Sequence, residues 1–183
     1  MTVLANDDGK KMVERDEIEP FLDEYAYLTG VKMILVAVGE RPDFVCEKKG
    51  RRYGLELVKA MNDPTKHSFE VILGRGDYLH GMDAASLVQE ITYAKDKKRA
   101  SPGWRYPKST ILVIQLIDSD GEEMANYLDD ELMDEMAETG FREIWIADYS
   151  QMEPYSTIQL IGVKPKRLRG LHRHRFYGTK PHG

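Results

Sequence analysis

The chain has 183 residues, of which 42% are apolar and 31% charged, and its formal net charge is −5. These values fit one soluble globular domain, and the single cysteine, Cys46, excludes a disulfide framework and a cysteine-rich zinc site. The N-terminal sequence lacks a basic stretch followed by an apolar one, and the longest apolar run, 33–38, is too short to cross a bilayer. We therefore expect a cytoplasmic protein with no membrane partner.

Apolar periodicity predicts the elements in chain order, beginning with an amphipathic helix over 16–28 that Gly30 ends. Its apolar residues follow helical spacing: Ile18, Phe21, Leu22, Tyr25 and Leu28. The elements expected after it are strands at 32–38 (of the buried type), 43–48 and 51–59, a long loop at 61–81, a helix at 83–99 with Asp83 as its N-cap, a strand at 110–117, a helix at 121–139, and strands at 143–147 and 157–163. This order predicts an α/β fold, in which a mixed sheet is flanked by helices.

Charge is distributed unevenly along the chain. Residues 164–183 include seven basic residues and no acid, whereas the rest of the chain carries 19 basic and 31 acidic residues. We therefore expect a single α/β domain at 1–163 and a basic C-terminal tail at 164–183. Such a tail on an acidic body suits a polyanion such as nucleic acid, and the alternative is a tail that is solvated or folds back on the acidic body. The acid-rich segment 118–138 is interpreted as an acidic surface helix, because it does not follow the plan of a calcium loop.

Two acidic residues are predicted to face each other across a hairpin. A two- or four-residue loop around 49–50 pairs Asp43 with Glu56, whereas a three-residue loop shifts the register by one. Like charges directly opposite each other destabilise a strand pair, so a hard divalent cation bound by both carboxylates is the simplest explanation. Gly54, on the same face, is expected to leave room above the sheet. The alternative is that a basic neighbour pairs with one or both acids: Arg41, Arg52 or Lys59.

The segment 41–44 (Arg-Pro-Asp-Phe), followed by 53–58 (Tyr-Gly-Leu-Glu-Leu-Val), resembles the motif of the PD-(D/E)XK nuclease superfamily. The resemblance implies a restriction endonuclease-like αβα core, whose order of helix, three strands, helix and strand is that predicted for 16–117. It implies that Asp43 and Glu56 are catalytic and bind Mg²⁺ or Mn²⁺. The superfamily often has a further acid on its first helix, for which Glu17 and Glu24 are the candidates.

The family's lysine, two residues after the second acid, is replaced here by Val58, and alternation sends the adjacent Lys59 to the opposite strand face. In some members of the superfamily the lysine lies on the following helix instead. Lys98 is therefore our candidate for the catalytic lysine, and Lys95 is the second choice. Lys98 is in phase with the stripe expected to face the core: Leu87, Ile91 and Ala94.

The resemblance thus implies a metal-dependent phosphodiesterase or nuclease whose partner is DNA or RNA. The alternative is a domain that kept the nuclease fold and lost its chemistry, and that binds nucleic acid through the tail or a protein through the acidic helix. Val58 favours this second interpretation. Motifs of other enzyme classes are missing, among them a phosphate-cradling glycine loop, Gly-x-Ser-x-Gly and HExxH. The sequence is also compatible with a homodimer.

Overall fold

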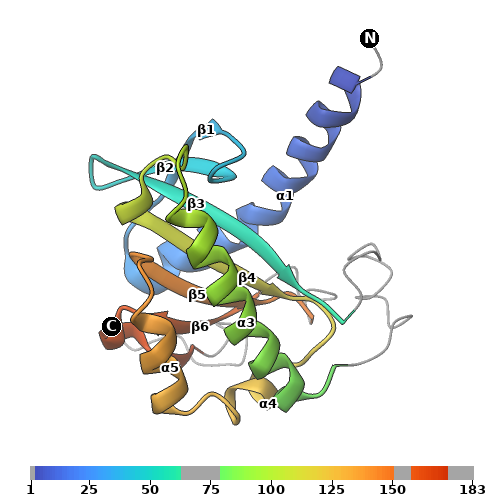
Figure 1. Ribbon diagram of the computed structural model, residues 1–183, viewed down its shortest axis with the longest axis vertical. Helices are drawn as coiled ribbons and strands as arrows, with labels where there is room; N and C mark the ends of the chain where they lie inside the picture. Colours follow the sequence, from blue (N-terminus) through green and yellow to red (C-terminus); the bar gives the residue numbers. More distant parts are fainter. Residues whose placement is uncertain (1–2, 63–78, 151–157, 173–183) are drawn as a thin grey trace.

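The computed structural model describes residues 3–62, 79–150 and 158–172. The described strands form one mixed sheet, in which they lie side by side in the order of the sequence. They are β1 (Ile34–Val38), β2 (Phe44–Lys48), β3 (Arg51–Ala60), β4 (Thr110–Leu116), β5 (Glu143–Asp148), β6 (Gln159–Lys164) and β7 (Gly170–His172). Strands β3, β4 and β5 are parallel, and the other neighbouring pairs are antiparallel. The predicted α/β fold with a mixed sheet is therefore confirmed (Figure 1).

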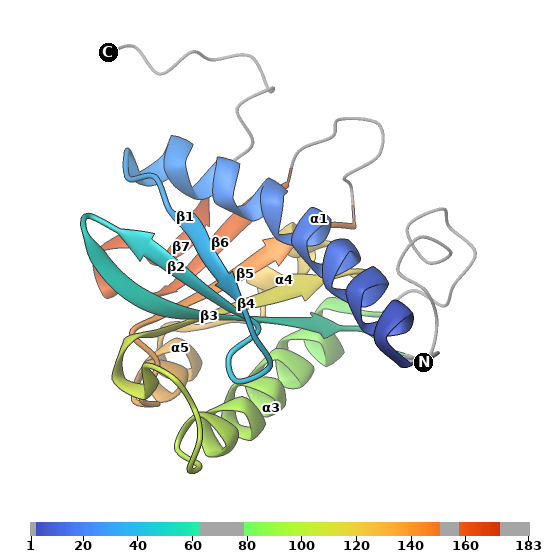
Figure 2. The same ribbon diagram turned by 90° about the horizontal axis from the view of Figure 1, so that it is seen from above.

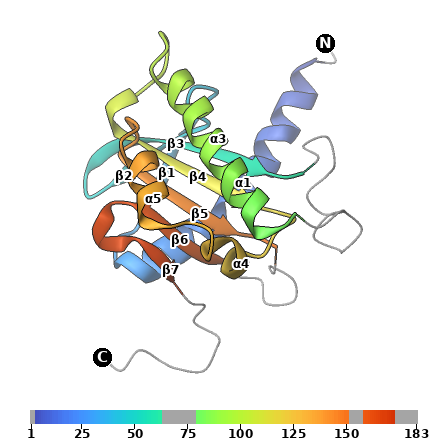
Figure 3. The same cartoon turned by 60° about the horizontal axis from the view of Figure 1, so that its bottom comes forward.

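Helices cover both faces of this sheet. The helices are α1 (Val3–Thr29), α3 (Gly81–Arg99), α4 (Gly121–Ala125) and α5 (Asp130–Ala137), with 3₁₀ turns η2 (Pro107–Ser109) and η3 (Lys166–Leu168). Figure 2 shows α1 on one side of the sheet and α3 and α5 on the other, and Figure 3 shows α3, α4 and α5 together on the nearer side. The arrangement is three-layered, with the sheet in the middle.

Alternation along the strands gives the sheet two apolar faces, as expected for parallel strands covered on both sides. On one face, α1 contributes Ile18, Phe21 and Tyr25 to a buried cluster with Phe44 and Trp145. On the other face, small and apolar residues of α3, α4 and α5 form a second cluster with Leu112 and Ile114 of β4 and Ile146 of β5. The helix residues are Ala84, Ala85, Val88, Met124, Met133 and Met136. Cys46 is a free cysteine buried in the first of these clusters.

The predicted single helix at 121–139 is wrong, because the segment forms two short helices. Asp120 caps α4 by accepting hydrogen bonds from the backbone N–H groups of Glu122 and Glu123, at 2.8 and 3.1 Å. Asp129 caps α5 in the same way through the N–H of Leu132, at 2.8 Å. A carboxylate that satisfies free N–H groups marks a helix start, so Asp129 begins a second helix where the prediction placed the interior of a single one.

Three other boundaries or burials differ from the predictions. Helix α1 begins at Val3, far earlier than 16, because its first turns have no apolar stripe to reveal them. Helix α3 follows His80, so Asp83 lies in the first turn and is not the N-cap. Strand β1 is an exposed edge strand and not a buried one, with Ile34 54% exposed. Most of the predicted long loop, 63–78, lies outside the described residues.

The segment predicted as a basic tail begins inside the sheet. Lys164 ends β6, η3 folds back over it, and β7 pairs with β6. Gly162 permits this close turn, because a Cβ atom there would lie 1.9 Å from the carbonyl oxygen of Leu168. Residues 173–183 lie outside the described part of the chain. Among the described helices, none is long and apolar enough to cross a membrane.

Candidate active site

The β2–β3 hairpin has the register predicted for a two-residue loop, with Lys48 opposite Arg51. Both loop residues have positive φ, 50° at Lys49 and 74° at Gly50. Positive φ at both central positions is the requirement of the tight hairpin turn whose twist matches that of the strands. The turn therefore sets the pairing of every residue further along the hairpin.

This register brings Asp43 and Glu56 together, as predicted. The backbone N–H of Asp43 donates a hydrogen bond of 3.2 Å to Glu56 Oε2, and the N–H of Leu57 donates one of 3.0 Å to Asp43 Oδ2. Each carboxylate is thus held by the backbone of the opposite strand. Both belong to the sheet face that α3 covers, because the neighbouring Val58 packs in the apolar cluster beneath that helix.

The lysine at this site is Lys95, the second choice of the sequence prediction. Its Nζ lies 2.6 Å from Glu56 Oε1, and the two side chains are 21% and 4% exposed. Lys98, the first choice, is exposed at the end of α3 and is not brought to the carboxylates. The buried stripe of α3 runs through Ala84, Ala85, Val88 and Thr92. Lys95 continues this stripe one turn later, whereas Lys98 lies beside it.

The basic neighbours considered as partners are mostly engaged elsewhere. Arg52 Nε lies 3.3 Å from Glu47, and Lys59 Nζ lies 3.0 Å from Glu17. Glu17, a candidate for the acid of the first helix, is therefore paired away from the site. The other candidate, Glu24, is buried.

Burial raises the pKa of Asp43 from 3.8 to about 7, and the negative charges of Glu56 and Glu14 add to this effect. The hydrogen bond from Leu57 and the charge of Lys95 lower the pKa of Asp43 in part. Glu14 comes from α1, so a first-helix acid does stand near the pair. Sequence reasoning missed it because the predicted helix began at 16, two residues too late to include it.

Gly54 serves close packing and not an open space above the sheet, which corrects the expectation from the sequence. A Cβ atom at this position would lie 2.7 Å from Cγ of the buried Pro42 and 3.1 Å from Oγ1 of Thr110. Pro42 immediately precedes Asp43, so the absence of a side chain at Gly54 lets the segment carrying this carboxylate lie directly on β3.

Gly54→Ala is therefore expected to destabilise the fold by about 1–3 kcal/mol, because the rigid proline ring must move to admit the methyl group. Urea unfolding measures the effect. Gly9→Ala is the matched control, since no atom lies within 4 Å of a Cβ there and the position is on a helix. The control is expected to be neutral or stabilising by up to about 1 kcal/mol. Equal unfolding midpoints for the two variants would contradict the packing role of Gly54.

The two carboxylates fit a small hard cation that takes only some of its ligands from the protein. Within the described residues, no group of three or more His, Cys, Asp or Glu side chains is arranged to hold a metal ion. Mg²⁺ is, however, usually bound through one or two carboxylates, with waters and substrate phosphates as its other ligands. Asp43 and Glu56 supply these two carboxylates, and a cation between them would offset the repulsion of their charges.

Comparisons of the chain with models of protein families, with curated proteins and with solved structures found no match. The interpretation of the site therefore rests on its own residues and geometry.

Proposed function

We propose that the protein is a metal-dependent phosphodiesterase that hydrolyses nucleic acid in the cytoplasm. Asp43 and Glu56 bind Mg²⁺ or Mn²⁺, and Lys95 takes the role first considered for Lys98. The observation that carries this proposal is the pair of carboxylates on adjacent strands with a lysine amino group 2.6 Å from one of them. The order α1, β1, β2, β3, α3, β4 supports it, because the resemblance to the PD-(D/E)XK superfamily implies this order.

The protein groups have distinct tasks in this reaction. Asp43 and Glu56 provide anionic oxygen ligands. Each carboxylate accepts a hydrogen bond from a backbone N–H group, and these hydrogen bonds keep both carboxylates oriented. A bound cation supplies positive charge that lowers the pKa of a coordinated water and stabilises charge on the phosphate oxygens. Lys95 donates hydrogen bonds to a phosphate oxygen, where negative charge increases in the transition state.

A second candidate function is nucleic-acid or protein binding without hydrolysis. Val58 occupies the position of the superfamily's lysine, and its side chain packs in the apolar cluster beneath α3. The ion pair with Lys95 also gives Glu56 a partner in the absence of any cation. Cleavage assays separate this binding domain from an enzyme.

The test is a cleavage assay with Mg²⁺ or Mn²⁺ on single- and double-stranded DNA and RNA. Lys95→Met is expected to reduce the cleavage rate by about 10²–10³-fold, the usual cost of removing one donor to a developing charge. Lys98→Met is the matched control, because it makes the same chemical change one turn along the same helix at an exposed position. We expect it to cleave at the wild-type rate.

Two results would contradict the proposal that the protein is an enzyme. One is no metal-dependent cleavage of any of these substrates by the wild type. The other is equal rates for the wild type and both lysine variants. Binding of nucleic acid without cleavage would then favour the second candidate function.

A further inference from the structure

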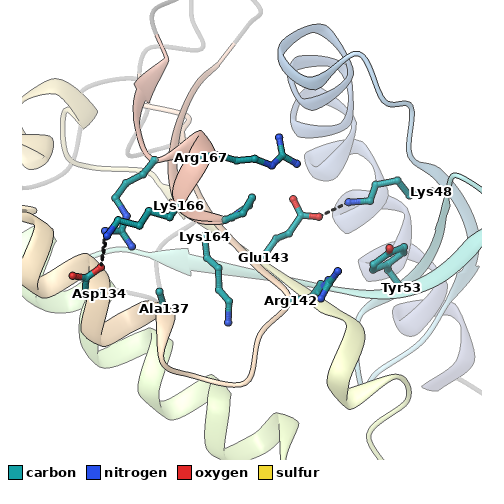
Figure 4. A pocket seen from close by; sticks show the side chains of 11 residues that line it. Lys48, Tyr53, Asp134, Ala137, Arg142, Glu143, Lys164, Lys166 and Arg167 are labelled. Carbon is teal, nitrogen blue, oxygen red and sulfur yellow. Dashed lines mark hydrogen bonds and ion pairs between the residues drawn. The ribbon is translucent and has the colours of Figure 1, made fainter.

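A cavity lined mostly by charged residues lies at the end of the sheet where β2 and β6 end and β5 begins. Its volume is about 560 Å³, and it opens between the β2–β3 hairpin, α5 and the turn η3 (Figure 4). The residues lining it come from four separate stretches of the chain: the β2–β3 hairpin, α5, the residues at and just before the start of β5, and the segment 164–169. Ligand pockets of roughly 300–1,000 Å³ are common, so the cavity has room for a molecule the size of a nucleotide.

Basic side chains outnumber acidic ones in this cavity, and both acids are already paired. Lys48 Nζ lies 2.5 Å from Glu143 Oε2, and Arg169 Nη1 lies 2.7 Å from Asp134 Oδ1. Within each pair, the positive and the negative charge neutralise each other. Lys166 Nζ also lies 4.0 Å from Asp134 Oδ1. Because six basic side chains line the cavity with only two acidic ones, its net charge is positive.

Two of these residues present unused donors. Arg142 and Arg167 are exposed, and within residues 3–62, 79–150 and 158–172 their side chains make no hydrogen bond or ion pair. Figure 4 shows them on different sides of Glu143, with Lys164 close by. Lys164 donates a hydrogen bond of 3.1 Å to the carbonyl oxygen of Thr139.

The basic groups of the cavity repel one another. Burial lowers the pKa of Lys164, and the positive charges of Arg142 and Arg99 lower it further. An anion placed among these groups would relieve the repulsion. A phosphate group has the required charge, and the planar guanidinium fork matches its oxygens with paired hydrogen bonds.

We propose that this cavity binds the phosphate groups of an anionic ligand, with Arg142 and Arg167 as the donors and Lys164 and Lys166 supplying further positive charge. Phosphate oxygens of a nucleotide and of a nucleic-acid backbone share this chemistry. The cavity takes its basic residues from the turn before β5 (Arg142), from the end of β6 (Lys164) and from η3 (Lys166 and Arg167). Neither Asp43 nor Glu56 lines it. The inference therefore stands whether or not the protein cleaves nucleic acid.

The test is calorimetric titration of inorganic pyrophosphate, and separately of a single-stranded oligothymidylate, into the full-length protein at fixed moderate salt. The double variant Arg142→Gln, Arg167→Gln is expected to lose at least about tenfold in affinity, because two charge-assisted contacts are removed. The matched control is Lys97→Gln, Lys98→Gln, which removes the same charge from exposed positions on α3. We expect it to bind as the wild type does.

The two ligands distinguish the source of the phosphate. Arginine-dependent binding of pyrophosphate identifies a terminal phosphate or pyrophosphate group as the natural ligand, and arginine-dependent binding of the oligonucleotide alone identifies a nucleic-acid backbone. The inference is overturned if neither ligand binds the wild type. It is also overturned if both double variants bind more weakly to the same extent, since that result would report only the overall charge.

Discussion

Asp43→Asn is expected to reduce metal-dependent cleavage by at least about a hundredfold while leaving the fold intact. Asn has nearly the same shape as Asp, and its side-chain oxygen still accepts the hydrogen bond that Leu57 donates. It lacks the charge that holds a divalent cation, so the loss falls on the stabilisation of the transition state. Asp23→Asn on α1 is the matched control, because Asp23 is exposed. Cleavage by Asp43→Asn at the wild-type rate would show that the carboxylate is not part of the site.

The same variant is expected to change how stability depends on pH. Because the folded state raises the pKa of Asp43 from 3.8 to about 7, it favours the protonated carboxyl. The folded protein then holds more protons than the unfolded chain between these two values, so this contribution to stability is complete below about pH 4 and is lost as pH rises through about 7. Asp43→Asn cannot lose a proton and is free of this loss.

The Tm of Asp43→Asn should therefore exceed that of the wild type by a few degrees at pH 8, and the difference should shrink toward pH 4. Scanning calorimetry without divalent cations measures it, with Asp23→Asn following the wild type. Parallel pH profiles for wild type and Asp43→Asn would rule out a raised pKa of Asp43.

The second large effect is expected at Glu143, where Glu143→Ala should lower the free energy of unfolding by about 3–5 kcal/mol. Glu143 accepts hydrogen bonds of 3.0 Å from the Tyr25 hydroxyl and 3.1 Å from the Trp145 indole N–H, and it pairs with Lys48 at 2.5 Å. The alanine leaves these donors unsatisfied and leaves the ammonium group of Lys48 without its counter-charge. Each of these losses costs free energy in a buried setting.

A double-mutant cycle separates the ion pair from the other losses. Glu143→Gln keeps an oxygen that accepts from Tyr25 and Trp145, and Lys48→Met removes the ammonium group while keeping most of the apolar stem. The double variant is expected to be clearly more stable than the sum of the two single costs implies, because no charge is left alone. Strictly additive free energies from urea unfolding would show that the charges of Lys48 and Glu143 are not coupled.

The carboxylate pair was predictable from the sequence because its geometry is local. The positive φ values at Lys49 and Gly50 are those of a two-residue hairpin turn, and the register of that turn places Asp43 beside Glu56. The lysine was harder to predict, because the buried face of α3 is made of small residues. Leu87 and Ile91 flank that face and are only partly buried, so a stripe drawn through the largest apolar residues leads to Lys98.

The basic cavity could not be predicted, because its parts meet only in the folded sheet. The charge count marked 164–183 as basic, but the pairing of β6 with β7 and the return of η3 turn the first part of this segment into a wall of the cavity. Lys48 and Arg142 reach it from the hairpin and from the start of β5. Contacts between such distant segments depend on the order of strands, which apolar periodicity does not reveal.

The central claim is that Asp43 and Glu56 together bind a divalent cation, and titration calorimetry of Mn²⁺ at pH 8 tests it most directly. The titration compares the wild type, the double variant Asp43→Asn, Glu56→Gln, and the control Asp23→Asn. We expect a saturable isotherm for the wild type and the control and none for the double variant. The absence of binding to the wild type, or equal binding by all three proteins, would contradict the claim.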